Sequence, residues 1–235
     1  MTFLQHKSFY VCILIFCIHA SCGEDENLLT EEYIPSAVEQ YYLDVALNAE
    51  FGNSNPRIKK WEDNLSIFVD HNGETELLEE LNRVIIEINS LSKSIRLDRV
   101  TNRTIANYFV FFGSEAAYKI LQADAPTENR NGLSTVNFQT NSKAIFNGNI
   151  YGNMWVDVVS VTDLDCQKHT LREELTQGLG LLNDTNDFPE SIFYQDSSCT
   201  TEYSPEDIMI LTYHLDPNIE ANMNKSEVIE IFSKD

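Results

Sequence analysis

The chain has 235 residues, 43% of them hydrophobic, so it is long enough to bury a core and is not predicted to be disordered. It carries 37 acidic and 16 basic residues, which give a formal net charge of −21. This balance argues against nucleic acid as a partner, because binding phosphate requires clustered Lys and Arg, and against electrostatic adsorption to anionic lipid.

The N-terminal segment, residues 1–21, has the layout of a signal peptide. Lys7 precedes an apolar run that is too short to span a bilayer, and small residues follow it. The letters HASC resemble a bacterial lipobox, in which Cys22 becomes the lipid-modified first residue. We therefore predict an exported protein of the bacterial cell envelope, anchored through Cys22 and an acidic tether at 22–36. Free secretion after ordinary cleavage is the alternative.

The cysteines agree with export. Of the five in the chain, two lie in the signal peptide and Cys22 would carry the lipid, which leaves Cys166 and Cys199. In an oxidising compartment we expect these two to form a disulfide, which would stabilise the fold by about 3–4 kcal/mol in the chain-entropy model. The alternative is two separate buried thiols.

The remaining residues, 37–235, predict one domain in which helices and strands alternate. Helices are expected at 36–52, 74–91, 114–123, about 167–182 and 204–215. Strands are expected at 65–70, 94–100, 107–113, 133–139 and 150–161. The strand at 107–113 is a continuous apolar run, which is typical of a strand buried on both faces.

One of these helices has two distinct faces when it is projected at 100° per residue. Its apolar stripe consists of Leu171, Leu175, Gly178, Leu179 and Leu182. His169, Glu173 and Gln177 form a polar line opposite the stripe. Gly178 and Gly180 each destabilise a helix by about 1 kcal/mol relative to Ala, so we expect them to mark a close backbone approach.

From Glu173 to Asp184 the sequence resembles the H-E-x-x-H-x-x-G-x-x-H-D motif of the metzincin zinc proteases. Glu174, the Leu-Gly-Leu segment and the final Asp coincide with the motif. The three histidine positions hold Glu173, Gln177 and Asn183. The same stretch is similar to an uncharacterised bacterial family, mostly of exported proteins, whose helix reads R-E-E-L-x-Q-x-L-G-L-x-N-D.

A second match lies downstream, where the segment SIFY is similar to the Met-turn of matrix-type enzymes, with Phe193 at the Met position. Together the two matches imply a zincin-like α/β (α+β) fold for residues 37–235. Such a fold has a mixed twisted sheet, a helix of the active-site type and a helical C-terminal part.

The replaced histidines bear on the chemistry. A catalytic zinc ion is usually held by imidazoles, whereas carboxylate and amide oxygens are hard ligands that suit zinc poorly as a set. The resemblance therefore implies a degenerate site without ordinary zinc peptidase activity and without a cofactor. Glu174 would be catalytic only if the protein is an enzyme after all.

Three uses of this site remain open. Glu173, Gln177 and Asn183 form a hydrogen-bonded structural network, or they line a cleft that binds an extended peptide or protein segment along an edge strand. The candidate edge is 133–139 or the segment around residue 145. The third possibility is an atypical metallopeptidase or a metal-free hydrolase that uses Glu173 and Glu174.

We expect different roles for His169 and His214. His169 is a candidate binding residue one helical turn from Glu173, although a histidine near a helix start is commonly part of the polar surface. His214 is expected in the final helix as a packing residue.

Overall fold

The computed structural model describes residues 33–48, 56–70, 73–138, 152–196 and 198–234. They belong to a unit that extends from Tyr33 to Asp235. The predicted signal peptide, most of the tether, Cys22 and the alternative edge segment around residue 145 lie outside the described residues. No helix in the described ranges is both long and apolar enough to cross a bilayer.

The described chain contains these elements: α1 (Ala37–Leu47), β1 (Leu65–Asp70), α2 (Thr75–Leu91), β2 (Leu97–Val100), η1 (Arg103–Ile105), β3 (Tyr108–Gly113), α3 (Glu115–Leu121), β4 (Gly132–Val136), β5 (Gly152–Asp157), α4 (Leu164–Gln177), α5 (Pro205–His214) and α6 (Lys225–Phe232).

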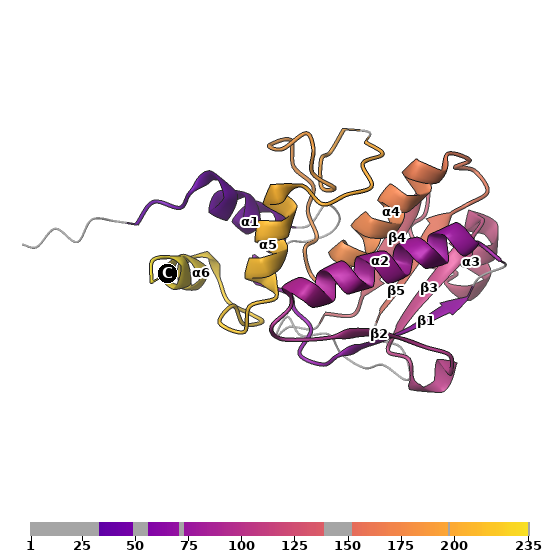
Figure 1. Cartoon of the computed structure of the whole chain (residues 1–235), viewed down its shortest axis with the longest axis horizontal. Helices are drawn as coiled ribbons and strands as arrows, with labels where there is room; N and C mark the ends of the chain where they lie inside the picture. Colours follow the sequence, from indigo (N-terminus) through magenta and orange to yellow (C-terminus); the bar gives the residue numbers. More distant parts are fainter. Residues whose placement is uncertain (1–32, 49–55, 71–72, 139–151, 197, 235) are drawn as a thin grey trace, which may run out of the picture. The chain divides into compact units, whose positions relative to one another are not determined.

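The strands form one mixed sheet in the order β2-β1-β3-β5-β4 (Figure 1). The pairs β1–β2, β1–β3 and β3–β5 are parallel, and β4 runs antiparallel to β5. The predicted α/β (α+β) fold class with a mixed sheet is thus confirmed. Within the described residues β4 forms one edge of the sheet, which agrees with the expectation for 133–139.

Helices cover both faces of the sheet, and β3 shows the consequence. Its alternate residues Tyr108, Val110 and Phe112 belong to the main core, which also contains the buried faces of α2 and α4. Phe109 and Phe111 belong to a second cluster together with Tyr118 of α3. A strand covered on both sides needs apolar residues at every position, and all six residues of β3 are buried.

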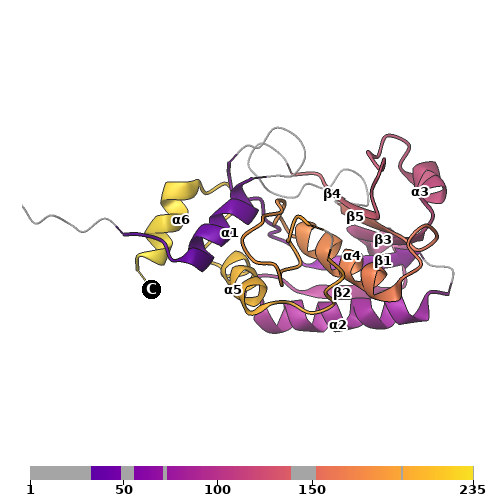
Figure 2. The ribbon, with the colours of Figure 1, turned by 90° about the horizontal axis from the view of Figure 1, so that it is seen from above.

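The part beyond the sheet consists of α1, α5 and α6 (Figure 2). The ring of Tyr42 on α1 packs edge-on against Tyr213 of α5 and Phe232 of α6. Helix α6 was not predicted from the sequence, although its signals were present. Asn224 caps its N-terminus in a capping box with Glu227. His214 therefore lies in α5 and not in the final helix as expected, and it is fully buried.

Candidate functional site

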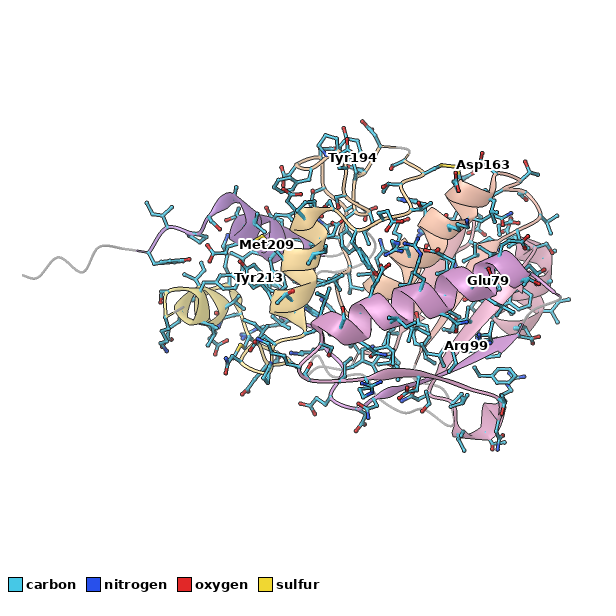
Figure 3. All side chains as sticks on the ribbon, viewed as in Figure 1. Glu79, Arg99, Asp163, Tyr194, Met209 and Tyr213 are labelled. Atoms are coloured by element: carbon cyan, nitrogen blue, oxygen red, sulfur yellow. A yellow bond between two sulfur atoms is a disulfide. The ribbon has the colours of Figure 1, made fainter. Side chains whose placement is uncertain are left out.

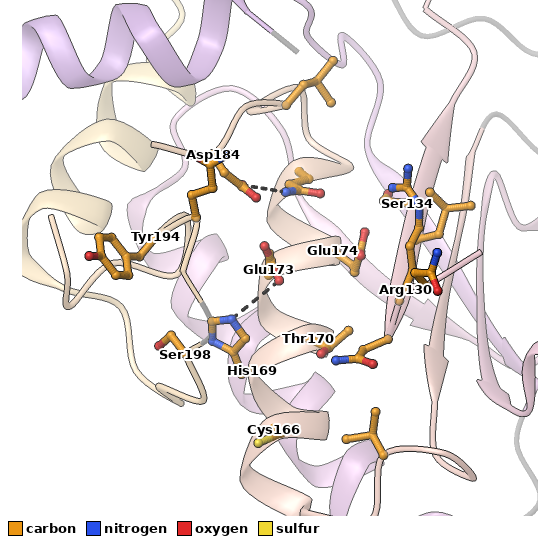
Figure 4. Close-up of a pocket in the computed structure, with 18 of the residues that line it drawn as sticks. Arg130, Ser134, Cys166, His169, Thr170, Glu173, Glu174, Asp184, Tyr194 and Ser198 are labelled. Atoms are coloured by element: carbon orange, nitrogen blue, oxygen red, sulfur yellow. Dashed lines mark hydrogen bonds and ion pairs between the residues drawn. The ribbon is translucent and has the colours of Figure 1, made fainter. Parts of the chain in front are cut away.

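A pocket of about 750 Å³ lies between β4, α4 and the segment 182–199 (Figure 4). The volume falls within the range of about 300–1,000 Å³ that is usual for ligand sites. Ser134 lines it from β4, Thr170 and Glu174 from α4, and Tyr194 from the long segment. The pocket thus combines an edge strand with the polar face of a helix.

The polar line of α4 faces this pocket. His169, Glu173 and Gln177 lie on successive turns and all line it. This orientation follows from the apolar stripe on the other side of the helix, because Leu171 and Leu175 are fully buried in the main core. Burial of the apolar stripe fixes the rotation of α4 about its axis and turns the polar line towards the cavity.

His169 is not part of the polar surface, because only 8% of the residue is exposed. Its Nδ1 lies 2.9 Å from the carbonyl oxygen of Thr200. A carbonyl can only accept, so Nδ1 carries the proton of the neutral ring and Nε2 presents a lone pair. Nε2 lies 3.6 Å from Oε2 of Glu173. Burial lowers the pKa of His169, which favours the neutral ring.

Gln177 and Asn183, which the motif resemblance was expected to place together, have their side chains bonded to different parts of the chain. Gln177 donates from Nε2 to Oδ1 of Asp184 at 3.1 Å and lines the pocket. Asn183 instead donates from Nδ2 to the carbonyl oxygen of Asp44 on α1 at 3.3 Å and is not among the lining residues. Among the described residues, the amide of Gln177 thus bonds to Asp184 and the amide of Asn183 bonds to α1.

The turn after α4 explains this divergence. The expected helix at 167–182 begins earlier and already ends at Gln177, with Gly178 as its C-cap. Gly180 has a φ of +120°, and a Cβ there would lie 1.9 Å from the carbonyl oxygen of Lys59. A Cβ on Gly178 would lie 2.3 Å from the hydroxyl of Tyr108. The predicted close approach is confirmed, but it occurs beyond the helix end, where the chain reverses and carries Asn183 towards α1.

The edge strand crosses α4 at close range. A Cβ on Gly132 would lie 2.3 Å from the methyl carbon of Thr170 and 3.1 Å from Cγ of Glu174. Glu174, of which 8% is exposed, lies on the floor of the pocket beside β4. The sequence analysis did not identify Ser134, which lines the pocket next to Glu174 and whose Oγ is 2.8 Å from the hydroxyl of Tyr108.

The register of β4 determines which backbone groups face the open edge. Asp157 donates its backbone N–H to the carbonyl of Asn131 at 2.8 Å. These two residues are opposite each other, since Gly132 pairs with Val156. Bonded and non-bonded pairs alternate along antiparallel strands, so the N–H and C=O of Ser134 point away from β5. Within the described sheet, β4 thus turns the ladder groups of Ser134 away from β5, and Ser134 lines the pocket.

The Cys166–Cys199 disulfide predicted from the sequence is confirmed, with Cα atoms 4.4 Å apart. Cys166 lies in the first turn of α4, and both cysteines line the pocket. Thr200, which holds the ring of His169, follows directly in the chain. The disulfide therefore fastens the wall opposite β4 to the helix that forms the floor.

Arg172 of the same sequence stretch has a structural role. It is fully buried, and its guanidinium donates to Glu87 at 2.5 Å and to Glu80 at 3.0 Å, both on α2. The ring of Tyr203 covers it at 4.3 Å. This ion cluster holds α4 against α2 on the side away from the pocket. Figure 3 shows the side chains of this region, including Glu79 on the outer face of α2.

Phe193, for which the resemblance implied a Met-turn position, is fully buried in the main core. Its carbonyl accepts the backbone N–H of Thr185 at 2.9 Å. In the described ranges no group of three or more His, Cys, Asp or Glu side chains is placed to hold a metal ion.

The fold and the pocket define a mixed α/β protein with a cleft that runs along the edge of its sheet. The chain belongs to the family DUF2927, described as a protein of unknown function, which it matches over residues 35–234. Comparison with curated proteins gives no match. A similar solved structure is titled "Structure of Myroilysin". It is 13% identical, with a TM-score of 0.42, and the match covers 68% of this chain and 83% of that chain.

Proposed function

We propose that residues 37–235 form a zincin-like domain that binds an extended peptide or protein segment without hydrolysing it through an ordinary zinc centre. The observation that carries the proposal is the pairing of an edge strand with a pocket. β4 turns backbone N–H and C=O groups outwards at Ser134, and the pocket begins at that edge. An added strand would complete the ladder there, and the pocket would receive its side chains.

The chemistry of the motif positions supports binding over zinc hydrolysis. Glu173 and Gln177 offer oxygen and amide groups where a zinc enzyme has imidazoles. Asn183, at the third position, bonds to α1 and not into the pocket. Metal analysis of purified protein tests this part, and stoichiometric zinc would contradict it.

The binding proposal is tested by a proline at the outward-facing position of β4. Ser134→Pro removes the outward N–H without removing a bond to β5, as is tolerated on edge strands. Ser134→Ala is the matched control, because it also loses the hydroxyl contact to Tyr108 but keeps the N–H. On an array of short random peptides, we expect the wild type and Ser134→Ala to retain a common subset and Ser134→Pro to lose it.

A second measurement does not depend on how well the proline variant folds. Peptides retained on the array are N-methylated at one residue at a time. Added-strand binding predicts that methylation weakens binding at every second residue, because only alternate N–H groups of the peptide face β4. The proposal fails if the wild-type protein retains no peptide, or if methylation has no alternating effect. Cleavage of retained peptides would favour the hydrolase that uses Glu173 and Glu174.

We also propose that the protein is exported and anchored through Cys22. The signal-peptide layout, the lipobox-like HASC and the disulfide support this, since disulfides persist in oxidising compartments. The lipid on Cys22 would hold the strongly acidic chain at a membrane to which its own charge does not attract it. Detergent partitioning of Cys22→Ala is the test: the wild type should enter the detergent phase and the variant the aqueous phase. A variant that still partitions into detergent would contradict the anchor.

A further inference from the structure

The pocket is lined by charge of predominantly one sign. Its carboxylates come from α4, from the segment 182–199 and from the segment that precedes β4: Glu128, Glu173, Glu174, Asp184 and Asp196. Arg130 is the one Lys or Arg among the described lining residues. Lys119, from outside the pocket, pairs with Glu128 at 2.9 Å, and Glu128 therefore contributes little net charge. Among the described lining residues the remaining carboxylates outnumber the guanidinium, and a lining of this sign favours a cationic occupant over an anionic one.

Glu173 and His169 form the part of the pocket where we expect a cation to bind. Because Nδ1 of His169 donates to Thr200, the Nε2 lone pair faces the Glu173 carboxylate at 3.6 Å. Both groups are acceptors in this state, so neither donates a hydrogen bond to the other. A cation with several N–H donors could bond to both, and charge-assisted bonds of this kind are about twice as strong as neutral ones.

A strand added beside β4 would direct alternate side chains towards Glu173 and His169. Alternate side chains of a strand lying beside β4 point to the same face of the sheet as that of Ser134, which is the face that α4 covers. We propose that the occupant of the cleft is a basic extended segment, with an Arg or Lys side chain that binds Glu173 and Nε2 of His169. This inference rests on the proposed peptide-binding function and adds the chemistry of the recognised residue.

The test uses short peptides of alternating Val and Thr with one variable central residue: Arg, Lys, citrulline, norleucine or Glu. Citrulline keeps the shape of Arg without its charge, and norleucine does the same for Lys. Binding to the full chain is measured by fluorescence anisotropy. We expect the Arg or Lys peptide to bind at least about fivefold more tightly than its neutral counterpart, and the Glu peptide most weakly. Which of the two cations binds better distinguishes a guanidinium from an ammonium site.

The protein side of the test is Glu173→Gln, which removes the charge and keeps the size. It should bring the Arg and citrulline peptides to within about twofold of each other, because the charge-assisted bond is gone. Glu79→Gln is the matched control, since it changes the net charge equally from an exposed position on α2 outside the pocket. It should leave the preference unchanged.

The outcomes separate this inference from the function on which it rests. If charged and neutral peptides bind equally and Ser134→Pro still abolishes binding, the cleft binds peptides but the basic preference is wrong. Equal loss of preference in Glu173→Gln and Glu79→Gln would also overturn it, because net charge and not the site would then be responsible. If no peptide of any charge binds, the proposed function itself fails.

Discussion

Two glycines with positive φ show how single residues set the path of the chain. Gly73 has a φ of +107° with nothing within 4 Å of a built Cβ, whereas a Cβ on Gly180 would meet the Lys59 carbonyl at 1.9 Å. Gly73 is thus required only for its backbone conformation, and Gly180 also for space. The reversal at Gly180 is what separates Asn183 from Gln177.

Alanine substitutions at Gly73 and at Gly180 form a matched pair. Gly73→Ala should cost about 1–2 kcal/mol through backbone strain alone. Gly180→Ala should cost at least about 2 kcal/mol more, because only a backbone shift relieves the overlap. Urea unfolding of both variants measures the difference. Equal losses of stability would show that the approach to Lys59 is not as close as described.

His214 is a residue whose effect depends on pH. It is fully buried, with Nε2 3.1 Å from the Leu179 carbonyl and Nδ1 3.3 Å from the Tyr42 hydroxyl. Burial, assisted by the charge of Lys60, lowers the pKa of His214 to about 3. The unfolded chain binds a proton at this histidine below about pH 6.5, and the folded protein does not until about pH 3. The stability contributed by His214 is therefore complete above pH 6.5 and lost as the pH falls.

We predict that, because of His214, the free energy of unfolding falls by about 1.4 kcal/mol for each pH unit as the pH is lowered from 6 to 4. His214→Gln removes the titration. The stability gap between wild type and variant at pH 7 should therefore shrink by that amount per unit as the pH is lowered, with the contributions of other groups cancelling. Denaturant unfolding at several pH values measures the gap, and a constant gap would contradict the prediction.

At the scale of elements, Asp207 joins α5 to α1 and to the buried turn at Phe193. The carboxylate is fully buried and accepts four hydrogen bonds. Two come from the hydroxyls of Tyr41 and Ser191, and two from the backbone N–H groups of Ile192 and Ser204. The segment from Ser204 to Asp207 is thus a capping box that also anchors neighbouring elements.

We predict a defined order of destabilisation at this position. Asp207→Ala leaves buried donors without an acceptor and should cost about 4 kcal/mol. Asp207→Asn should cost about 1–2 kcal/mol, because the two hydroxyls can rotate to accept from its amide. Ser36→Ala, in the exposed capping box of α1, should cost about 1 kcal/mol. Thermal unfolding ranks the three, and an Asn variant as unstable as the Ala variant would contradict the assignment.

At the scale of the whole molecule, the disulfide closes a loop of 33 residues between α4 and the far wall of the pocket. Removing it with Cys166→Ala and Cys199→Ala should lower the free energy of unfolding by about 3–4 kcal/mol in the chain-entropy model. The reduced wild type should lose a similar amount. Denaturant unfolding with and without reductant measures both, and a loss below about 1 kcal/mol would show that the bridge does not constrain the unfolded chain.

The sequence determined the elements and the polarity of the site. Helical spacing of apolar residues placed α2 close to its observed bounds, and short apolar runs bounded by polar residues placed β1 and β3. The polar line on α4 and the cysteine pair followed from the same local rules. Local signals for α6 were also present in the capping box.

Only the tertiary structure decided which polar groups meet. From its spacing in the sequence, Asn183 was expected beside Gln177 at the position of a third metal ligand. The turn at Gly180 instead directs the Asn183 amide to α1 and leaves Asp184 beside Gln177. His169 is buried and bonds to the carbonyl oxygen of Thr200. The disulfide between Cys166 and Cys199 ties the segment that contains Thr200 to α4. Ser134 joins the site because β4 crosses α4. Such contacts depend on how elements distant in sequence pack together, which residue spacing along a single helix does not encode.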